Sequence, residues 1–506
     1  MKKIQLFVYI FLLSGSVYNN YAQDFNQVHK LIMEGISAIY DIDFPTALDK
    51  FQQAKSIAPN DLRGPFFEST VYFWKTMFNH NKTDYETYLD LSDKIIKKCE
   101  DATDINPNDL DAQFYMGWTY TIRATLIYTI DQNVIKAASD VKDGNKALSY
   151  VVEKNPQYYD AYLGLGVYNY MLGMIPKKLK FLTDILGFKG DREEGKKQLQ
   201  VASEKGTYTT TEAKFYLTLL SWREENYTSA EDYAGQLLNL YPKSPAVWMV
   251  EGLLLSQQDK MKEAVDAYEK ALDFNKGKES DIVYKTVYGA LGNAYFRMND
   301  FNKAIDAGKK YMQYITKDDR YNNRLYSIGV SLELTGNRSE AMAYYKQAKL
   351  ESDKHGEWEK YWYRKINNLI YRPITLNDSL LIVGENNRAV GNLDEAMNDY
   401  NILSEKSGQS PSPDLAVQIN YGIGSVYFKQ KDYNKAIELF QKNLNLVPQE
   451  ERWLVPDSYF QIGRCYLRLG NKTEANKYFD KALDIDYDYD FKDAMDGKIQ
   501  NELTKF

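Results

Sequence analysis

The chain has 506 residues, of which 44% are apolar, 26% charged and 14% aromatic, so it can bury a large core. Glycine and proline are too few for a collagen-like or low-complexity chain. The formal net charge of −7 argues against a general nucleic-acid-binding protein, which needs a basic surface to displace phosphate counterions. With two cysteines, Cys99 and Cys465, a disulfide framework and a multi-cysteine metal site are both excluded.

The first 22 residues have the composition of a secretory signal peptide. Lys2 and Lys3 precede an apolar run over residues 4–13, and small or polar residues follow up to Ala22. We therefore predict cleavage near Ala22 and export of a soluble protein to the periplasm or the outer envelope. The alternative is an N-terminal helix that stays with the fold. No later apolar run approaches the roughly eighteen residues that a membrane span needs.

The rest of the chain repeats a spaced pair of small residues. Seven glycines are each followed by an alanine twelve residues later, at Gly35/Ala47, Gly252/Ala264, Gly292/Ala304, Gly329/Ala341, Gly384/Ala396, Gly424/Ala436 and Gly463/Ala475. Four residues beyond the alanine, six of the seven units carry an aromatic residue, and the exception carries Gly308. Spacings of three, four and seven residues share one helical face, so the pattern predicts antiparallel helix pairs. We expect the small residues to let two backbones cross closely, and the aromatic residue to fill the wedge toward the next unit.

This spacing resembles the tetratricopeptide repeat, in which each unit of about 34 residues is one pair of helices. Weaker copies of the pattern lie between the clear ones. The resemblance implies an all-α fold, a right-handed superhelical α-solenoid of about ten or eleven helix pairs. No isolated pair can bury its apolar face, so the stability of such a chain comes from the stacking of neighbouring pairs.

Departures from the repeat divide the chain. We predict a signal peptide at 1–22, an irregular repeat block with insertions at 23–205, a central repeat block at 206–353, an aromatic bridging helix at 354–376, a C-terminal repeat block at 377–490 and a capping helix at 491–506. The bridging helix carries Tyr361 and Trp362 beside basic residues, a combination that is also typical of proteins that stack nucleic-acid bases. The negative net charge and the lack of a wider basic stripe argue against that alternative.

Residues 164–202 depart most clearly from the repeat. A short apolar helix is predicted after Pro176, followed by a turn at Gly190-Asp191-Arg192. The string from Ile175 to Gly195 resembles the eukaryotic inclusion-body-clearance family of tetratricopeptide proteins and its bacterial relatives. That family has no accepted catalytic activity, so the resemblance implies no enzyme. The basic amphipathic segment 175–188 could also lie on a membrane surface, which gives a membrane-associated adaptor as the alternative function. We favour a packed insertion, because the apolar stripe is short.

Searches for chemical motifs find none. P-loop, nucleophile-elbow and zinc-protease patterns are missing from the sequence. Residues 484–490 superficially resemble a calcium loop, but Tyr489 stands where glycine is required, so a solvated turn is predicted. We predict no catalytic residue, no metal and no cofactor. A catalytic solenoid is kept as a remote alternative, which would need ionisable groups with perturbed pKa values in one pocket.

The predicted function is therefore that of an exported, non-catalytic scaffold. The resemblance implies that the first helix of each unit lines a concave groove. Its predicted partner-binding residues are Phe215, Trp222, Met249, Asn293, Phe296, Tyr326, Arg388, Tyr421, Phe428, Phe460 and Arg464. Aromatic residues and arginine dominate interface energetics, so a protein or peptide is the expected partner. Nucleic acid is not expected, and a membrane surface is the less favoured partner. About half of these side chains could instead be buried in packing. The oligomeric state is left open.

Overall fold

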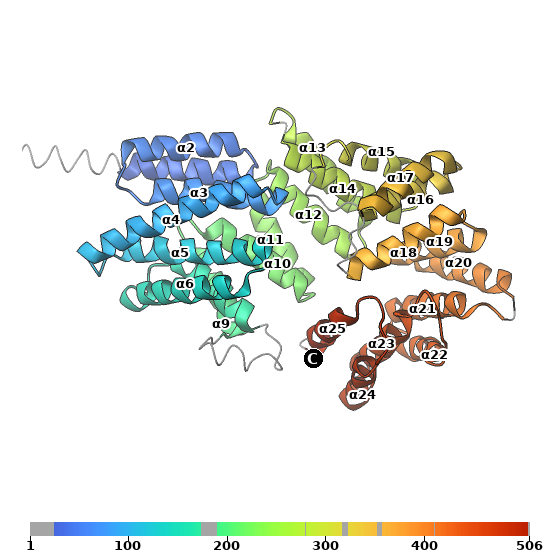
Figure 1. The fold of residues 1–506 in the computed structure, drawn as a ribbon. Helices are drawn as coiled ribbons and strands as arrows, with labels where there is room; N and C mark the ends of the chain where they lie inside the picture. The colour runs from blue at the N-terminus through green and yellow to red at the C-terminus, as the bar shows by residue number, and fades with distance from the viewer. Residues whose placement is uncertain are drawn as a thin grey trace, which may run out of the picture. The chain divides into compact units, whose positions relative to one another are not determined.

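The computed structural model describes residues 25–173, 190–278, 280–315, 322–351, 357–408 and 410–503. The predicted signal peptide at 1–22 and the amphipathic segment 175–188 lie outside these residues. All regular structure in the described ranges is helical (Figure 1). Within them, the helices are either too short or too polar to cross a membrane.

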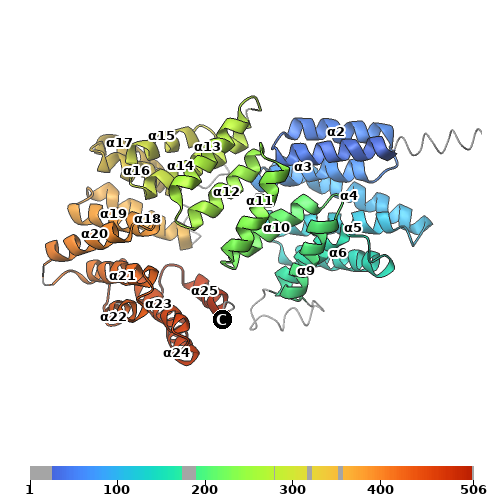
Figure 2. The same ribbon diagram turned by 180° about the vertical axis from the view of Figure 1, so that it is seen from behind.

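The chain forms two compact units. Unit 1 contains Met1–Val250 and Lys270–Val283, and unit 2 contains Glu251–Glu269 and Tyr284–Phe506. The boundaries fall within three helices, α12 (Pro245–Gln257), α13 (Met261–Asn275) and α14 (Asp281–Arg297). Figures 1 and 2 show that successive helices in each unit lie side by side as antiparallel pairs.

Unit 1 begins with a helix over residues 25–40. The helices that follow it in unit 1 are α2 (Phe44–Ile57), α3 (Arg63–Asn79), α4 (Lys82–Ile105), α5 (Leu110–Leu126), the π-helix η1 (Ile127–Asp131), α6 (Val134–Lys154), α7 (Ala161–Gly173), α9 (Arg192–Lys205), α10 (Thr210–Arg223) and α11 (Tyr227–Leu240). The packed pairs are α3 with α4, α5 with α6, α7 with α9, and α10 with α11.

Unit 2 continues the same scheme. Its helices after α14 are α15 (Phe301–Tyr311), α16 (Asn322–Leu334), α17 (Arg338–Glu351), α18 (Glu357–Tyr371), α19 (Leu376–Ala389), α20 (Leu393–Lys406), α21 (Pro413–Lys429), α22 (Tyr433–Asn443), α23 (Leu454–Arg468), α24 (Lys472–Leu483), the 3₁₀ turn η3 (Lys492–Ala494) and α25 (Met495–Leu503). Here α16 pairs with α17, α19 with α20, α21 with α22, and α23 with α24. The prediction of an all-α, tetratricopeptide-like array of helix pairs is confirmed.

The turn inside each pair has a fixed backbone geometry. Seven residues after each repeated glycine, the chain adopts a left-handed conformation, at Ile42, Asp259, Asn299, Gly336, Gly391, Lys431 and Gly470. Glycine suits this conformation because it lacks a Cβ atom. An Asp or Asn usually follows and caps the second helix, as Asp432 does by accepting a hydrogen bond from the backbone N–H of Lys435. The sequence thus ends one helix and starts the next with three residues between them.

The repeated glycine leaves room for the aromatic ring of its own unit. A Cβ atom on Gly329 would lie 2.5 Å from Cε1 of Tyr345. The same close approach occurs between Gly35 and Phe51, Gly252 and Tyr268, Gly424 and Phe440, and Gly463 and Phe479. The structure therefore differs from our expectation that the ring fills the wedge toward the next unit, because the ring packs across its own pair. Tyr400, on α20, does contact the next pair, since a Cβ atom on Gly422 of α21 would lie 2.4 Å from its ring.

The unit that lacks the aromatic residue is packed by its neighbour. Gly308 stands at the aromatic position of the Gly292 unit. A Cβ atom on Gly308 would lie 2.5 Å from Cγ1 of Ile328, which belongs to α16 of the next pair. Ile328 is 2% exposed. The missing ring is thus replaced by a buried aliphatic side chain, which explains why this unit keeps the helix-pair geometry.

In unit 1 the helix over residues 25–40 lies against α10. The ring of Tyr40 stacks on that of Phe215, with centroids 5.4 Å apart and planes inclined by 18°. The carbonyl of Tyr40 accepts a hydrogen bond of 2.5 Å from the Ser244 hydroxyl. Near the start of the same helix, His29 Nδ1 and the Tyr208 hydroxyl share a hydrogen bond of 2.9 Å. The beginning of the array in unit 1 is therefore fastened to its later helices.

Candidate protein-interaction surface

The facing sides of the first helices in unit 1 are filled with aromatic side chains. The ring of Phe66 on α3 lies 4.6 Å from Trp118 and 5.2 Å from Tyr115, both on α5. Phe67 lies 5.4 Å from Tyr208, which precedes α10. Phe66, Phe67, Tyr115 and Trp118 are all at most 4% exposed. These rings form the core of unit 1, and a partner could reach them only if the unit opened.

The three predicted partner-binding residues of unit 1 lie in different environments. Phe215 on α10 is half-buried under Tyr40. Met249 on α12 is 8% exposed and is part of the core. Trp222, near the end of α10, is half-buried and keeps accessible ring surface. In unit 1, packing inside the unit therefore accounts for the apolar side chains of Phe215 and Met249. Trp222 is still open to a partner.

One carboxyl group in unit 1 has a pKa near neutrality. Burial raises the pKa of Glu212, on α10, to about 7. Tyr40 and Tyr216 lie close enough for Glu212 to add to the increase that burial causes in their own pKa values. Across the described ranges, no group of three or more His, Cys, Asp or Glu side chains could hold a metal ion. Glu212 thus changes charge near pH 7 where the 25–40 helix meets α10.

In unit 2 an aromatic row crosses the first helices. The row consists of Tyr326 on α16, Trp362 and Tyr361 on α18, Trp453 just before α23, and Tyr421 on α21. Its successive ring centroids are 4.8, 5.3, 6.5 and 6.2 Å apart. All five side chains are half-buried. Two of them, Tyr326 and Tyr421, are predicted partner-binding residues, and the row joins them through α18.

A buried ion pair lies beside the centre of the aromatic row. The ammonium group of Lys365 on α18 donates to the carboxylate of Glu451, which is 5% exposed. The indole N–H of Trp453 donates to the other carboxylate oxygen at 2.9 Å. Burial alone would lower the pKa of Lys365, but Tyr361 and Glu451 raise it above its ordinary value. A lysine paired with a carboxylate therefore lies beside the middle of the row.

A second buried carboxylate lies at the α23 end of the row. Asp457 is 3% exposed and accepts hydrogen bonds from the Tyr421 hydroxyl at 2.6 Å and from Gln461 at 3.1 Å. Lys498 on α25 donates to its other oxygen at 3.0 Å. Burial alone would raise the pKa of Asp457, but Lys498 and the Tyr421 hydroxyl hold it below its ordinary value. Asp457 thus binds α21 and α25 to α23.

The structure brings three of the predicted residues together at the end of unit 2. The guanidinium of Arg464 lies 4.6 Å from the ring centre of Phe428 and 5.8 Å from that of Phe460. Phe460 itself is 6% exposed and packs against Phe479, so it belongs to the core. Phe428 is half-buried. The Nε atom of Arg464 is 3.3 Å from the carboxylate of Glu502 on α25.

The other predicted residues of unit 2 are half-buried. Arg388 on α19 donates to Glu385 at 2.6 Å. Burial alone would lower the pKa of Arg388, but Glu385 and Tyr400 raise it. Phe296 packs against the hydrophobic cluster that contains Ile328, and Asn293 precedes it on α14. Asn293, Phe296 and Arg388 therefore remain accessible on the first helices.

The sequence did not reveal the role of residues 487–503, which we call the C-terminal segment. The prediction of a solvated turn at 484–490 is wrong for Tyr489, which is 6% exposed. Phe491 is also buried, with its ring 5.3 Å from Tyr361 and 5.6 Å from Trp453. The physical reason is that this stretch lies against the aromatic row. Tyr487, Tyr489 and Phe491 alternate with aspartates, and this period of two is typical of an extended segment with one buried side.

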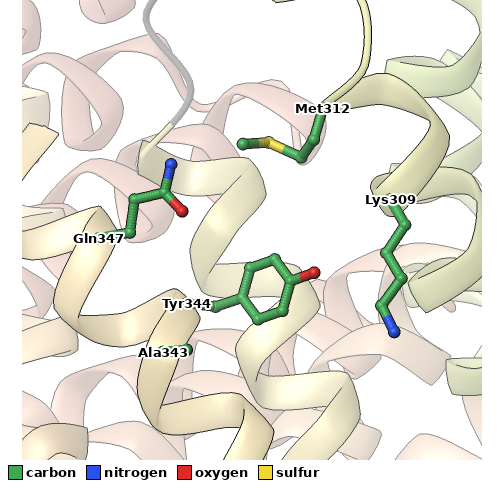
Figure 3. A pocket seen from close by; sticks show the side chains of 5 residues that line it. All are labelled: Lys309, Met312, Ala343, Tyr344 and Gln347. Atoms are coloured by element: carbon green, nitrogen blue, oxygen red, sulfur yellow. The ribbon is translucent and has the colours of Figure 1, made fainter.

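A small hollow lies on the second helices of unit 2. Its volume is about 240 Å³, and its lining comes from Lys309, Met312, Ala343, Tyr344 and Gln347. Figure 3 shows the Tyr344 ring beside the Lys309 side chain, with Met312 above them and Gln347 on the opposite side. Lys309 is already paired with Glu340 at 2.7 Å. The hollow therefore belongs to the second-helix surface and has no part in the aromatic row.

Two protein-family profiles match the chain. The tetratricopeptide repeat profile matches residues 415–488, which cover α21 to α24. The profile described as Iml2/Tetratricopeptide repeat protein 39 matches residues 68–313. This second range includes residues 164–202, so the resemblance drawn from that stretch is confirmed and extends well beyond it.

The chain is also similar to several known proteins and solved structures. Tetratricopeptide repeat protein ttc-39B of Caenorhabditis elegans is 22% identical over 303 residues, which are 51% of each chain. Outer dynein arm-docking complex subunit 4 of Xenopus laevis is 26% identical over 196 residues, which are 36% of this chain and 30% of the relative. The chain thus spans about half the length of the worm relative and less of the frog one. The solved human IFIT1 dimer with PPP-AAAA is 13% identical, covers 91% of this chain and 95% of its own, and has a TM-score of 0.34.

Proposed function

We propose that this chain, which belongs to the tetratricopeptide repeat proteins and carries an Iml2/tetratricopeptide repeat protein 39 domain, is a non-catalytic scaffold that binds a protein or peptide partner through the first helices of unit 2. The observation that carries the proposal is the set of half-buried aromatic and arginine side chains on these helices, which comprises the aromatic row, Arg388 on α19, and Phe428 with Arg464 beside its ring. Half-buried rings beside arginine are the side chains that contribute most to protein interfaces. An extended or helical peptide is the natural ligand for such a surface.

The proposal favours the predicted residues that keep accessible surface. These are Trp222 in unit 1, and Asn293, Phe296, Tyr326, Arg388, Phe428 and Arg464 in unit 2. Met249 and Phe460 support them from the core. Tyr421 is tied to Asp457, so its contribution to a partner would come through its ring edge rather than its hydroxyl.

The test compares cross-linked partners recovered from the native cells by the wild type and by a Phe428→Ala/Arg388→Ala variant. We expect at least a tenfold loss of the specific partner, because two interface anchors of this kind each contribute about 1–2 kcal/mol. Tyr371→Ala is the matched control, since Tyr371 is 77% exposed at the end of α18, where its ring faces Lys349. Unchanged recovery by a double variant of normal helical content would contradict the proposal.

We also propose that the protein is exported before it acts as a scaffold. The support is the order of basic, apolar and small residues in the first 22 positions. Intact-mass measurement of the protein from its native cells should give a chain that starts at Gln23. A Phe11→Arg variant, which interrupts the apolar run, should retain Met1 and stay with the unprocessed fraction. If every fraction of the native cells contains only wild-type chains that start at Met1, export is ruled out.

A further inference from the structure

We propose that the C-terminal segment is an internal ligand of the aromatic row, and that the external partner carries an acidic segment with alternating aromatic residues that displaces it. This inference rests on the proposed function and adds the chemistry of the partner. Asp490 and Phe491 are the core of the recognised motif. Asp490 supplies a carboxylate to Arg364, and Phe491 supplies a ring to Tyr361, which lies one helical turn away on α18.

The first part of the segment binds α18 as a ligand would. The guanidinium of Arg364 donates to both oxygens of Asp490, at 3.1 and 2.7 Å. This two-point geometry is the one by which arginine selects a carboxylate. The Phe491 ring enters between Tyr361 and Trp453, and its exposed fraction falls to 8%. The aromatic row is therefore already occupied at its centre.

The second part of the segment, α25, contacts α23 through its side chains. Lys498 pairs with Asp457 at 3.0 Å, and Glu502 pairs with Arg468 at 2.9 Å. Met495 and Ile499 share a hydrophobic cluster with Phe460. Phe460 and Arg464, both predicted to bind a partner, are thus contacted by the chain's own last helix. The segment occupies the surface that sequence spacing assigned to a partner.

Three features of the segment bear on its exchange for an external partner. Its ion pairs are partly open to water, with side-chain exposure of 29% for Arg364 and 40% for Lys498. Their acidic partners, Asp490 and Asp457, are 10% and 4% exposed, so water reaches mainly the basic side of each pair. Phe491 adopts a left-handed backbone with φ of 67°, which is costly for an aromatic residue. Residues 484–494 separate α24 from α25, so the segment can leave without unwinding the last pair.

The charges around the segment specify an acidic partner. A hollow of about 250 Å³ between the segment and α18 is lined by Lys360, Arg364 and Arg452. Lys365 adds a fourth positive charge on α18. With the segment in place, Glu450, Asp488 and Asp490 line the same hollow, and Glu451 pairs with Lys365. Once the segment leaves, Glu450 and Glu451 alone offset the four positive charges. An acidic segment from another protein that fills the hollow would bind better than the internal segment, which leaves it open.

The test uses a fluorescent peptide with the sequence of residues 484–503 and the full-length chain. An Asp490→Asn/Phe491→Ala variant of the chain should release the internal segment. We expect it to bind the peptide at least about tenfold more tightly than the wild type, in which the internal copy competes. A peptide carrying the same two substitutions should not bind. Peptide binding no tighter to the folded variant than to the wild type would overturn the proposal, and the segment would then be a structural cap.

A charge swap provides the matched control. Asp490→Arg alone should release the segment, so hydrogen exchange in residues 487–503 should rise at least about tenfold. The added Arg364→Glu substitution should restore protection, because it recreates an ion pair of opposite polarity. Failure of the swap to restore protection would overturn the role of Asp490. A concentration-dependent dimer formed by exchange of segments between copies would assign the surface to a second copy and overturn the external partner.

The two proposals can fail separately. If the peptide binds the released variant but the Phe428→Ala/Arg388→Ala variant keeps its native partner, the proposed function is wrong and the internal ligand stands. If the partner is lost from that variant but the peptide never binds, the proposed function stands and the internal ligand is wrong.

Discussion

Replacing Tyr345 by alanine is expected to lower the free energy of unfolding of unit 2 by about 4 kcal/mol. The Tyr345 side chain has no exposed surface and fills the space above Gly329. Its hydroxyl donates a hydrogen bond of 3.0 Å to Glu333, so the substitution also removes a partner from a largely buried carboxylate. Urea unfolding followed by circular dichroism measures the change. Tyr345→Phe, which keeps the ring, should cost only about 1 kcal/mol.

A double-mutant cycle tests whether the ring and the glycine act together. Gly329→Ala alone should cost about 1–3 kcal/mol, because its new Cβ atom would lie 2.5 Å from the Tyr345 ring. In the Tyr345→Ala background the same methyl group enters an empty space, so Gly329→Ala should lower the free energy of unfolding much less. Additive costs for the two substitutions would contradict the glycine–ring interpretation of the repeat.

Replacing Asp160 by alanine is expected to destabilise unit 1 by about 3 kcal/mol. The Oδ1 atom of Asp160 accepts hydrogen bonds from the backbone N–H groups of Thr207, Tyr208 and Thr209 at 2.9, 2.9 and 3.0 Å. It also accepts one from the Thr209 hydroxyl at 2.8 Å. Asp160 is 8% exposed, so water cannot readily replace the lost acceptor. Thermal or urea unfolding of the full chain gives the change for unit 1.

Asp160→Asn is the matched control, because the amide oxygen can still accept at the Oδ1 position. We expect it to retain more than half of the stability that Asp160→Ala loses. Amide hydrogen exchange of Thr207, Tyr208 and Thr209 should accelerate in the alanine variant and change little in the asparagine variant. Equal destabilisation by the two substitutions would show that the negative charge, rather than the acceptor geometry, holds the loop.

The helix pairs could be predicted from sequence because their determinants are local. Gly329 and Tyr345 lie in one unit, and their spacing recurs wherever both residue types occur. The resemblance of residues 164–202 also held, because that stretch has a distinctive composition that few other helices share. Both signals depend on residues close together in the chain, which a one-dimensional pattern records.

The contacts that decide accessibility could not be predicted in the same way. Phe460 has the spacing of a groove residue, but it is covered by α25, whose path depends on the loop before it. Phe215 has similar spacing, but Tyr40 stacks on it from the first helix of the unit. Such contacts depend on how much each helix pair rotates relative to the last. That rotation arises from many small packing differences and leaves no periodic mark in the sequence.

The fastening of the 25–40 helix to α10 sets unit 1 apart from open repeat arrays. An open array frays from its ends, and its length can change by duplication or loss of one repeat. In unit 1, the Tyr40 contacts with Phe215 and Ser244 tie the terminal pair to helices far along the chain. Melting of that pair must break them, so unit 1 should unfold cooperatively rather than from its edge. A helix pair added between α2 and α10 would separate Tyr40 from Phe215 and Ser244, so these contacts match the present number of pairs in unit 1.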